Sequence, residues 1–195
     1  ACFLFTTSCS DFLDEEHKTK YSSEYVFGTP EGLKLAVNAL YALQRYYAND
    51  TENATIFALE RGTDLAVTNG GTGNFYGIYD PNYLKPSASQ VGFMWRTMYQ
   101  IIGKANEIIA AAEDLEDTPS LRATVSEAKC FRAQSYFLLY RTFDRIWLNI
   151  QPTTAENVND PRDFHAASEK EVFDLIYEDL EYALSLIHIS EPTRH

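Results

Sequence analysis

Apolar residues recur at intervals of three and four along much of this chain, the spacing that places them on one face of a helix. The first such stretch follows Thr29-Pro30-Glu31, where a hydroxyl cap, a proline in the first turn and an acidic side chain mark a helix start. Its apolar face comprises Leu33, Ala36, Leu40, Leu43 and Tyr47. The pattern predicts a long amphipathic helix that begins at residue 30.

Three more long helices are predicted downstream. The second covers roughly residues 90 to 113, the third starts at Thr118-Pro119, and the fourth follows the capping box formed by Ser168 and Glu171. Their apolar positions are Trp95, Met98, Tyr99, Ile102, Ala105 and Ile109, then Leu121, Val125, Ala128, Phe131, Ser135, Leu139 and Phe143, then Val172, Ile176, Leu180 and Ala183. Helix lengths and short connections favour antiparallel pairs.

The third helix is apolar around much of its circumference between residues 127 and 140, with no glycine or proline. Such a helix must be packed among neighbours instead of lying on a surface. Small residues such as Ala128 and Ala133 alternate with Phe131 and Tyr136, as in stacked helix pairs of the tetratricopeptide type. An ordinary core helix of an all-α domain is the alternative. Within this scaffold, Asn106 is expected to be a structural hydrogen-bonding residue, and Arg132 is expected to pair with Glu127 or Glu107.

Between about residues 50 and 90 the helical pattern gives way to glycines, asparagines and aromatic residues. A loop this long in a compact domain is generally functional or disordered, and its aromatic content disfavours disorder. Flat rings pack on the apolar faces of sugars, while amides and carboxylates hydrogen-bond to sugar hydroxyls. The candidate glycan-binding residues are therefore Asp64, Asn74, Phe75, Tyr76, Tyr79 and Tyr83. Alternatively, these rings only fix the loop to the helices.

A further candidate is Trp147, which follows the third helix and is expected to be exposed near a turn. It is either a platform for a sugar ring or a side chain that fills the core.

Composition narrows the function classes. The chain has 195 residues, 45% of them hydrophobic and 14% aromatic, which favours one folded domain over a disordered chain. A net charge of −12 argues against nucleic-acid binding, which needs clustered basic side chains. No apolar run is long enough for a membrane-spanning helix, and no Cys or His pair has metal-ligand spacing. No carboxylate is placed against a nucleophile, so neither catalysis nor a cofactor is expected.

The N-terminus has the pattern of a secretion signal. Residues 1–8 form a short apolar stretch followed by small residues, as at the end of a clipped signal peptide. Ser8 precedes Cys9, the arrangement that a lipoprotein signal peptidase cuts before the cysteine is acylated. Lipidation at Cys9 is therefore predicted, with residues 9–28 as a tether. An ordinary apolar N-terminus with a free thiol is the alternative.

The third helix also carries a family resemblance. Glu127-Ala128-Lys129, Phe131-Arg132-Ala133 and Tyr136-Phe137 resemble the central helix of outer-membrane nutrient-binding lipoproteins of the SusD/RagB type. Trp95 through Tyr99, with Asn106 and Ile109, resembles another helix of that family. The family usually has a glycine after Phe143, where this chain has Asp144.

The resemblance implies an all-α, SusD-like fold of tetratricopeptide-like helix pairs with one long irregular loop. It implies a surface-exposed, lipid-anchored protein of the outer membrane that binds glycans without catalysis. The implied partner is a TonB-dependent SusC-like transporter, to which the glycan is delivered. A tetratricopeptide-like scaffold that binds peptides or a partner protein is the alternative.

The last residues do not continue the family pattern. Residues 184–195 resemble a translated sequencing adapter, and helical patterning is expected to stop at about Ala183. The SusD-like region is therefore predicted to cover residues 29–183 and to be the N-terminal part of a longer, truncated family member.

Overall fold

The computed structural model describes residues 21–49, 89–154, 157–161 and 164–190. In these ranges the chain forms five helices and no strand, as the all-α prediction requires. The helices are α1 (Ser23–Gly28), α2 (Pro30–Asn49), α4 (Ser89–Ala112), α5 (Pro119–Phe143) and α6 (Glu169–Ser190).

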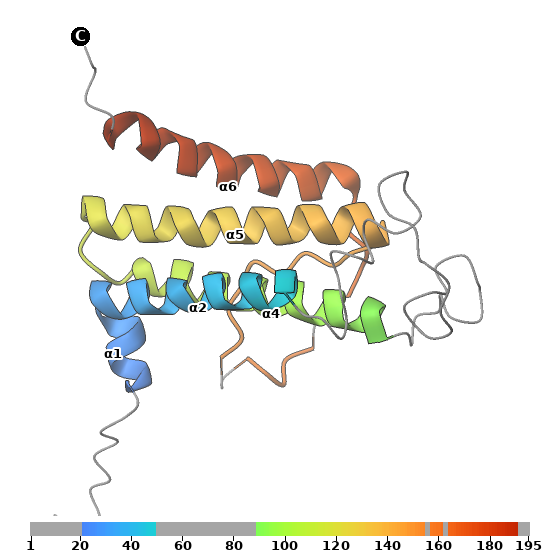
Figure 1. The fold of residues 1–195 in the computed structure, drawn as a ribbon, viewed down its shortest axis with the longest axis horizontal. Helices are drawn as coiled ribbons and strands as arrows, with labels where there is room; N and C mark the ends of the chain where they lie inside the picture. Colours follow the sequence, from blue (N-terminus) through green and yellow to red (C-terminus); the bar gives the residue numbers. More distant parts are fainter. Residues whose placement is uncertain (1–20, 50–88, 155–156, 162–163, 191–195) are drawn as a thin grey trace, which may run out of the picture.

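The four long helices form two antiparallel pairs, α2 with α4 and α5 with α6 (Figure 1). Helix α5 packs against α2, α4 and α6, so it has neighbours on most of its circumference. This arrangement confirms the prediction from its apolar pattern. Its small and aromatic residues, including Ala128, Ala133 and Tyr136, are buried between the pairs.

The predicted helix starts are confirmed by their caps. The hydroxyl oxygens of Thr29 and Thr118 accept hydrogen bonds from the backbone N–H of Gly32 (3.0 Å) and Leu121 (3.1 Å). At the start of α6, the carboxylate of Glu171 accepts the backbone N–H of Ser168 at 2.8 Å. The Ser168 hydroxyl in turn accepts the N–H of Glu171 at 3.3 Å. These bonds satisfy backbone donors that have no partner inside the helix.

The predicted apolar faces form one core. Leu33 and Leu40 on α2, Met98 and Ile102 on α4, and Leu139 on α5 are at most 1% exposed. Val172 and Ile176 cover this core from α6. The buried positions follow the helical spacing. Two residues of the predicted apolar faces are nevertheless exposed, Trp95 on α4 (36%) and Leu180 on α6 (39%), and Asp179 is buried next to Leu180.

Two helical segments differ from the sequence prediction. Helix α1 lies within the segment interpreted as a tether, and the Ser22 hydroxyl caps it by accepting the N–H of Tyr25. Gly32 permits the close approach of α1 to α2, since an added Cβ would lie 2.6 Å from the Val26 carbonyl oxygen. At the other end, α6 continues to Ser190, beyond the predicted end of helical patterning at Ala183.

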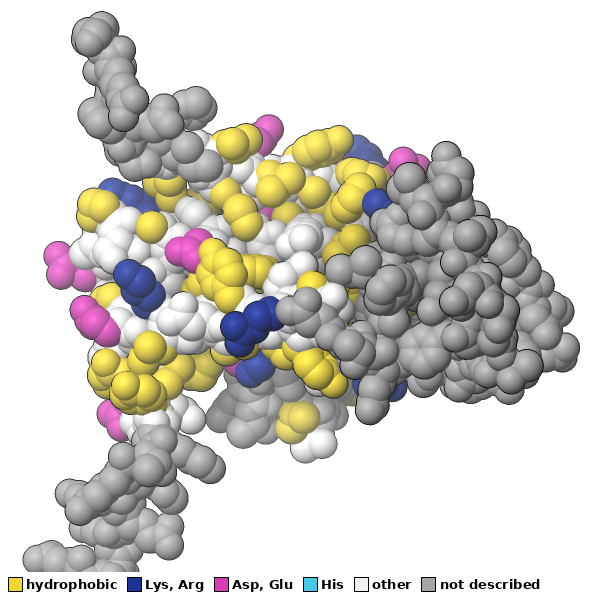
Figure 2. All heavy atoms as spheres, in the orientation of Figure 1, with side chains coloured by type: hydrophobic (Ala, Val, Ile, Leu, Met, Phe, Trp, Pro, Cys, Tyr) yellow, Lys and Arg dark blue, Asp and Glu magenta, His cyan; other side chains and the backbone are white. Residues whose placement is uncertain are grey.

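Helix α6 carries a second apolar stripe that faces away from α5. Tyr177 is 60% exposed and Leu184 is 53% exposed, while Val172 and Ile176 on the opposite face are buried. Hydrophobic side chains are visible along the edge of the molecule where α6 runs (Figure 2). None of the helices in the described ranges is both long and apolar enough to cross a bilayer.

Candidate functional site

Five aromatic rings form a continuous surface group, here called the aromatic cluster: Trp95, Tyr99, Phe143, Trp147 and Phe164. Helix α4 supplies the first two, the last turn of α5 supplies Phe143, and the chain between α5 and α6 supplies the others. Neighbouring ring centroids lie 4.8 to 6.3 Å apart. These are ordinary distances for interacting aromatic rings.

The aromatic cluster is open to solvent at two of its members. Trp95 is 36% exposed and Phe164 is 70% exposed, whereas Tyr99, Phe143 and Trp147 are half-buried. Trp147 stacks on Tyr99 with an interplanar angle of 25° and lies against Phe164 with centroids 4.8 Å apart. The cluster therefore offers apolar ring surface that is anchored to the helices on one side.

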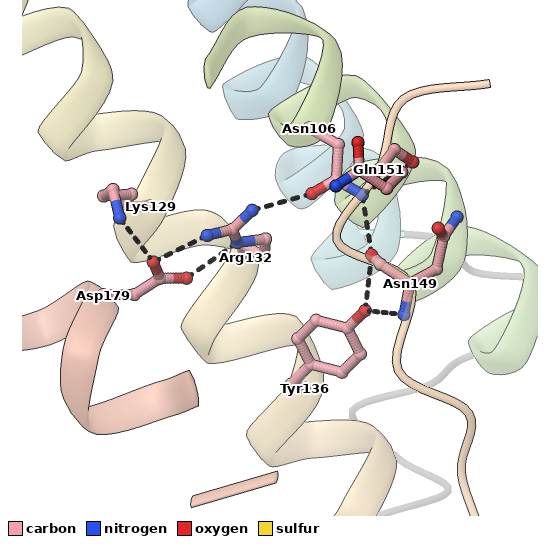
Figure 3. Close-up of polar contacts among 7 residues, drawn as sticks. All are labelled: Asn106, Lys129, Arg132, Tyr136, Asn149, Gln151 and Asp179. Carbon is pink, nitrogen blue, oxygen red and sulfur yellow. Dashed lines mark hydrogen bonds and ion pairs between the residues drawn. The ribbon is translucent and has the colours of Figure 1, made fainter. Parts of the chain in front are cut away.

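Two tyrosine hydroxyls hold the backbone of the chain that leaves α5. The Tyr99 hydroxyl accepts the N–H of Trp147 at 3.0 Å and donates to the carbonyl of the same residue at 2.8 Å. The Tyr136 hydroxyl does the same for Asn149, with both bonds at 2.8 Å (Figure 3). Burial raises the pKa of both tyrosines above the ordinary value, so both hydroxyls stay protonated at neutral pH.

A buried polar chain connects this segment to three helices. Asp179 of α6, 0% exposed, receives two hydrogen bonds of 2.8 Å from the guanidinium of Arg132 on α5. Arg132 also donates to the side-chain oxygen of Asn106 on α4 at 2.9 Å. The amide nitrogen of Asn106 donates to the carbonyl of Asn149 at 2.7 Å (Figure 3). Lys129 adds a second cation 3.0 Å from Asp179.

The polar chain confirms the structural role predicted for Asn106, but the predicted partners of Arg132 are wrong. Arg132 points to α6 and pairs with Asp179 instead of Glu127 or Glu107. Glu127 lies five positions before Arg132, a spacing that does not place two side chains together on a helix. Its carboxylate accepts the hydroxyl of Tyr41 on α2 at 2.7 Å. Glu107 lines a groove between α1, α2 and α4.

The chain turns out of α5 through a backbone conformation that side chains rarely adopt. Asp144 has φ of 61° and ψ of −50°, and it is the sole non-glycine residue with positive φ in the described ranges. The N–H of Arg145 reaches the carbonyl of Phe143 at 2.6 Å across this tight turn. Turns of this geometry are strained for residues with a Cβ. The strain lies three residues before Trp147.

Most of the predicted site residues belong to parts of the chain that the structure does not describe. Asp64, Asn74, Phe75, Tyr76, Tyr79, Tyr83 and the predicted lipidation site Cys9 lie outside the described residues. Trp147 is described, and it is half-buried within the aromatic cluster instead of exposed. Sequence reasoning assigned Trp95 and Tyr99 only to a helix face and did not select Phe164. The four-residue spacing of Trp95 and Tyr99 indicates that they share one helix surface. No sequence pattern relates either residue to Trp147, which lies 48 positions after Tyr99.

The described residues also form other hollows, one of them on α6, where Phe173 and Tyr177 lie beside Glu169, Lys170 and Asp174. A groove of about 350 Å³ lies between α1, α2 and α4, but apart from Lys104 and Glu107 its lining is largely aliphatic and aromatic, with Phe27, Leu35 and Ile108 among it. No group of three His, Cys, Asp or Glu side chains in the described ranges is arranged to hold a metal ion.

Comparison with known proteins gives consistent matches. A SusD-like family model, described as "Starch-binding associating with outer membrane", matches residues 11–192. SusD-like proteins P2 and P38 of Formosa agariphila are 29% and 28% identical to this chain over 184 and 180 residues. These matches cover 92% and 90% of this chain but 35% and 34% of the relatives, so the chain spans about a third of their length.

Solved structures show the same fold. A SusD-like carbohydrate binding protein of Bacteroides fragilis superposes with a TM-score of 0.60 at 16% identity, over 84% of this chain and 32% of that one. A second SusD-like protein of that organism superposes with a TM-score of 0.63 at 18% identity, over 89% of this chain and 33% of that one. A structure with xylogluco-oligosaccharide superposes with a TM-score of 0.59 at 20% identity, over 78% of this chain and 29% of that one. At these identities the likeness concerns the fold alone.

Proposed function

This chain belongs to the SusD-like family, whose description is starch-binding and associated with the outer membrane, and from that premise we propose that it binds neutral glycans without altering them chemically. The observation that carries the proposal is the aromatic cluster, a set of contacting rings exposed at Trp95 and Phe164. Rings of this kind pack on the apolar faces of pyranose sugars. A net charge of −12 favours neutral over anionic polymers, because like charges repel.

Polar groups beside the cluster suit hydroxyl-bearing ligands. Asp144 and Arg145 are exposed at the turn that precedes Trp147. A carboxylate accepts hydrogen bonds from sugar hydroxyls and a guanidinium donates several in a fixed fork. Apolar rings with adjacent donors and acceptors are the combination that a sugar needs. We extend the proposed site to Asp64, Asn74, Phe75, Tyr76, Tyr79 and Tyr83 on the same chemistry.

The proposal includes a place for the protein in uptake. We propose that Cys9 is acylated, that the protein is displayed at the cell surface, and that it delivers glycans to a TonB-dependent SusC-like transporter. The family description supports the association with the outer membrane. Cys9→Ala should move the protein from the membrane fraction to the soluble fraction. Full-length protein of natural sequence that carries no acyl chain on Cys9 by mass spectrometry would contradict lipid anchoring at this residue.

Glycan binding is tested by calorimetric titration of the purified protein with a panel of neutral oligosaccharides, including maltoheptaose and a xylogluco-oligosaccharide. At least one is expected to bind. Trp147→Leu keeps an apolar side chain but removes the flat ring, so it should weaken binding about tenfold, or about 1.4 kcal/mol, a value in the range of one aromatic contact. Phe137→Leu, at an exposed ring of α5 outside the aromatic cluster, is the matched control and should not change affinity. Binding of unstructured peptides without response to any polysaccharide would favour the scaffold alternative.

A further inference from the structure

We infer that the hydroxyl groups of Tyr99 and Tyr136 are positioning groups that hold the backbone around Trp147, so that its ring is placed against Tyr99 and Phe164 in the aromatic cluster. The inference rests on the proposed function, because it concerns how the proposed glycan platform is held. The Tyr99 hydroxyl bonds the backbone of Trp147, and the Tyr136 hydroxyl bonds the backbone of Asn149 two residues later.

The two tyrosines use the same geometry on alternate residues. Each hydroxyl accepts the N–H and donates to the carbonyl of one residue, Trp147 for Tyr99 and Asn149 for Tyr136, at 2.8 to 3.0 Å. A hydroxyl with one proton and free lone pairs can make both bonds at once. In a β-sheet, these backbone N–H and carbonyl groups would instead bond to a neighbouring strand. The backbone on both sides of residue 148 is therefore fixed without a sheet.

The segment that contains Trp147 and Asn149 is also anchored on both sides. Ile146 is 1% exposed in the core, and its carbonyl accepts the N–H of Ala167 at 2.8 Å. At the other end, Asn106 donates to the carbonyl of Asn149. Asn106 therefore links the residue held by Tyr136 to the buried Arg132–Asp179 pair. Trp147 lies between these two anchors, and the two hydrogen bonds from Tyr99 hold its backbone in place. Its ring direction then follows from packing against Tyr99 and Phe164.

The roles of the ring and the hydroxyl of Tyr99 can be separated. Its ring stacks on Trp147, while its hydroxyl bonds the Trp147 backbone. Tyr99→Phe keeps the stacking ring and removes only the two hydrogen bonds. Tyr47 on α2 offers a matched control, because its hydroxyl is buried and has no hydrogen-bond partner among the described residues. Tyr47→Phe therefore removes a buried hydroxyl without freeing a backbone group.

The first test reads the orientation of Trp147 directly. The chain has two tryptophans, so in a Trp95→Phe background Trp147 is the single tryptophan reporter. Tyr99→Phe and Tyr136→Phe should reduce the near-ultraviolet circular dichroism of Trp147 and lower its fluorescence anisotropy, with far-ultraviolet helicity unchanged. Tyr47→Phe should leave both signals unchanged. Unaltered Trp147 signals in both Tyr99→Phe and Tyr136→Phe would overturn the inference.

The second test asks whether Tyr99 acts through Trp147. In titrations with the oligosaccharide of the panel that binds, Tyr99→Phe should weaken affinity about tenfold in the natural background, equivalent to about 1.4 kcal/mol. In the Trp147→Leu background it should cause no further loss, since coupled residues are not additive. Equal losses in both backgrounds would overturn the positioning role while leaving glycan binding intact. Full affinity in Trp147→Leu would instead contradict the proposed site, and the spectroscopic test would still decide whether the hydroxyls orient Trp147.

Discussion

The buried tyrosines of this protein differ in what their hydroxyl groups contact. The hydroxyls of Tyr99 and Tyr136 each bond two backbone atoms. The hydroxyl of Tyr47 is buried with no partner among the described residues, and burial raises its pKa. A buried hydroxyl without a hydrogen bond loses its hydration and gains nothing in return. The same chemical group therefore stabilises the fold at two positions and destabilises it at a third.

Tyr47→Phe should accordingly increase the free energy of unfolding by about 1 kcal/mol. The ring packing is retained while the desolvation cost of the hydroxyl is removed. Urea unfolding followed by far-ultraviolet circular dichroism measures the change, with Tyr136→Phe as the opposite case that should be destabilising. A loss of stability in Tyr47→Phe would mean that its hydroxyl has a partner.

Asp144 provides a second prediction about a single residue. Its φ of 61° is strained for a side chain with a Cβ, and a glycine would relieve that strain. Asp144→Gly should raise the free energy of unfolding by about 1 kcal/mol. Asp144→Ala keeps the Cβ and should give no such gain. Equal midpoints of thermal unfolding for the two variants would count against backbone strain at this turn.

At the scale of elements, one buried ion pair connects α5 and α6. Asp179→Ala leaves Arg132 buried without its carboxylate partner, which typically costs about 3–5 kcal/mol. The double variant Arg132→Met/Asp179→Leu removes the buried guanidinium and its carboxylate together and should recover part of that loss. The recovery is incomplete because Lys129 and the side-chain oxygen of Asn106 each lose a partner. Chemical unfolding of the single and double variants measures the coupling. Additive losses would show that the two side chains do not act as a pair.

The start of α6 should respond to pH. Hydrogen bonds from the Ser168 hydroxyl and from its backbone N–H lower the pKa of the Glu171 carboxyl. A carboxyl with a lower pKa in the folded state contributes stability above its unfolded pKa, and that contribution is lost as pH falls through the folded value. The pKa of Glu171, followed by NMR, should therefore rise in Ser168→Ala. An identical titration curve in the variant would mean that the capping box does not hold the carboxylate.

The helices were predictable because their signals are local. Thr118-Pro119 and the pair Ser168 and Glu171 lie within a few residues of the starts they define. The partner of Arg132 was not predictable in this way, because Asp179 lies 47 positions away. Helix α1, Ser23–Gly28, is too short to show a periodic apolar face. Local patterns thus determine elements, while contacts between elements depend on how those elements pack.

For the whole molecule, the family and the all-α fold followed from sequence motifs spread along the chain, and the match over residues 11–192 agrees with them. The aromatic cluster did not follow in the same way. Trp147 was selected as a candidate, but its contacts with Tyr99 and Phe164 join an α4 residue to a segment without regular structure. No periodicity relates positions in such a segment to a helix. The sequence could predict that aromatic residues would form a surface, but which rings meet in the aromatic cluster depends on the fold.

The central claim is that a glycan packs on the aromatic cluster, which is exposed at Trp95 and Phe164 and includes the half-buried Trp147 ring. It is tested most directly by titrating the panel oligosaccharides into the natural chain, whose two tryptophans both lie in the aromatic cluster, and recording the tryptophan emission. Stacking of a sugar replaces water at the indole, so saturating glycan should shift the emission to shorter wavelength, with a midpoint equal to the calorimetric dissociation constant. Calorimetric binding with unchanged tryptophan emission would place the glycan away from the aromatic cluster and contradict the account.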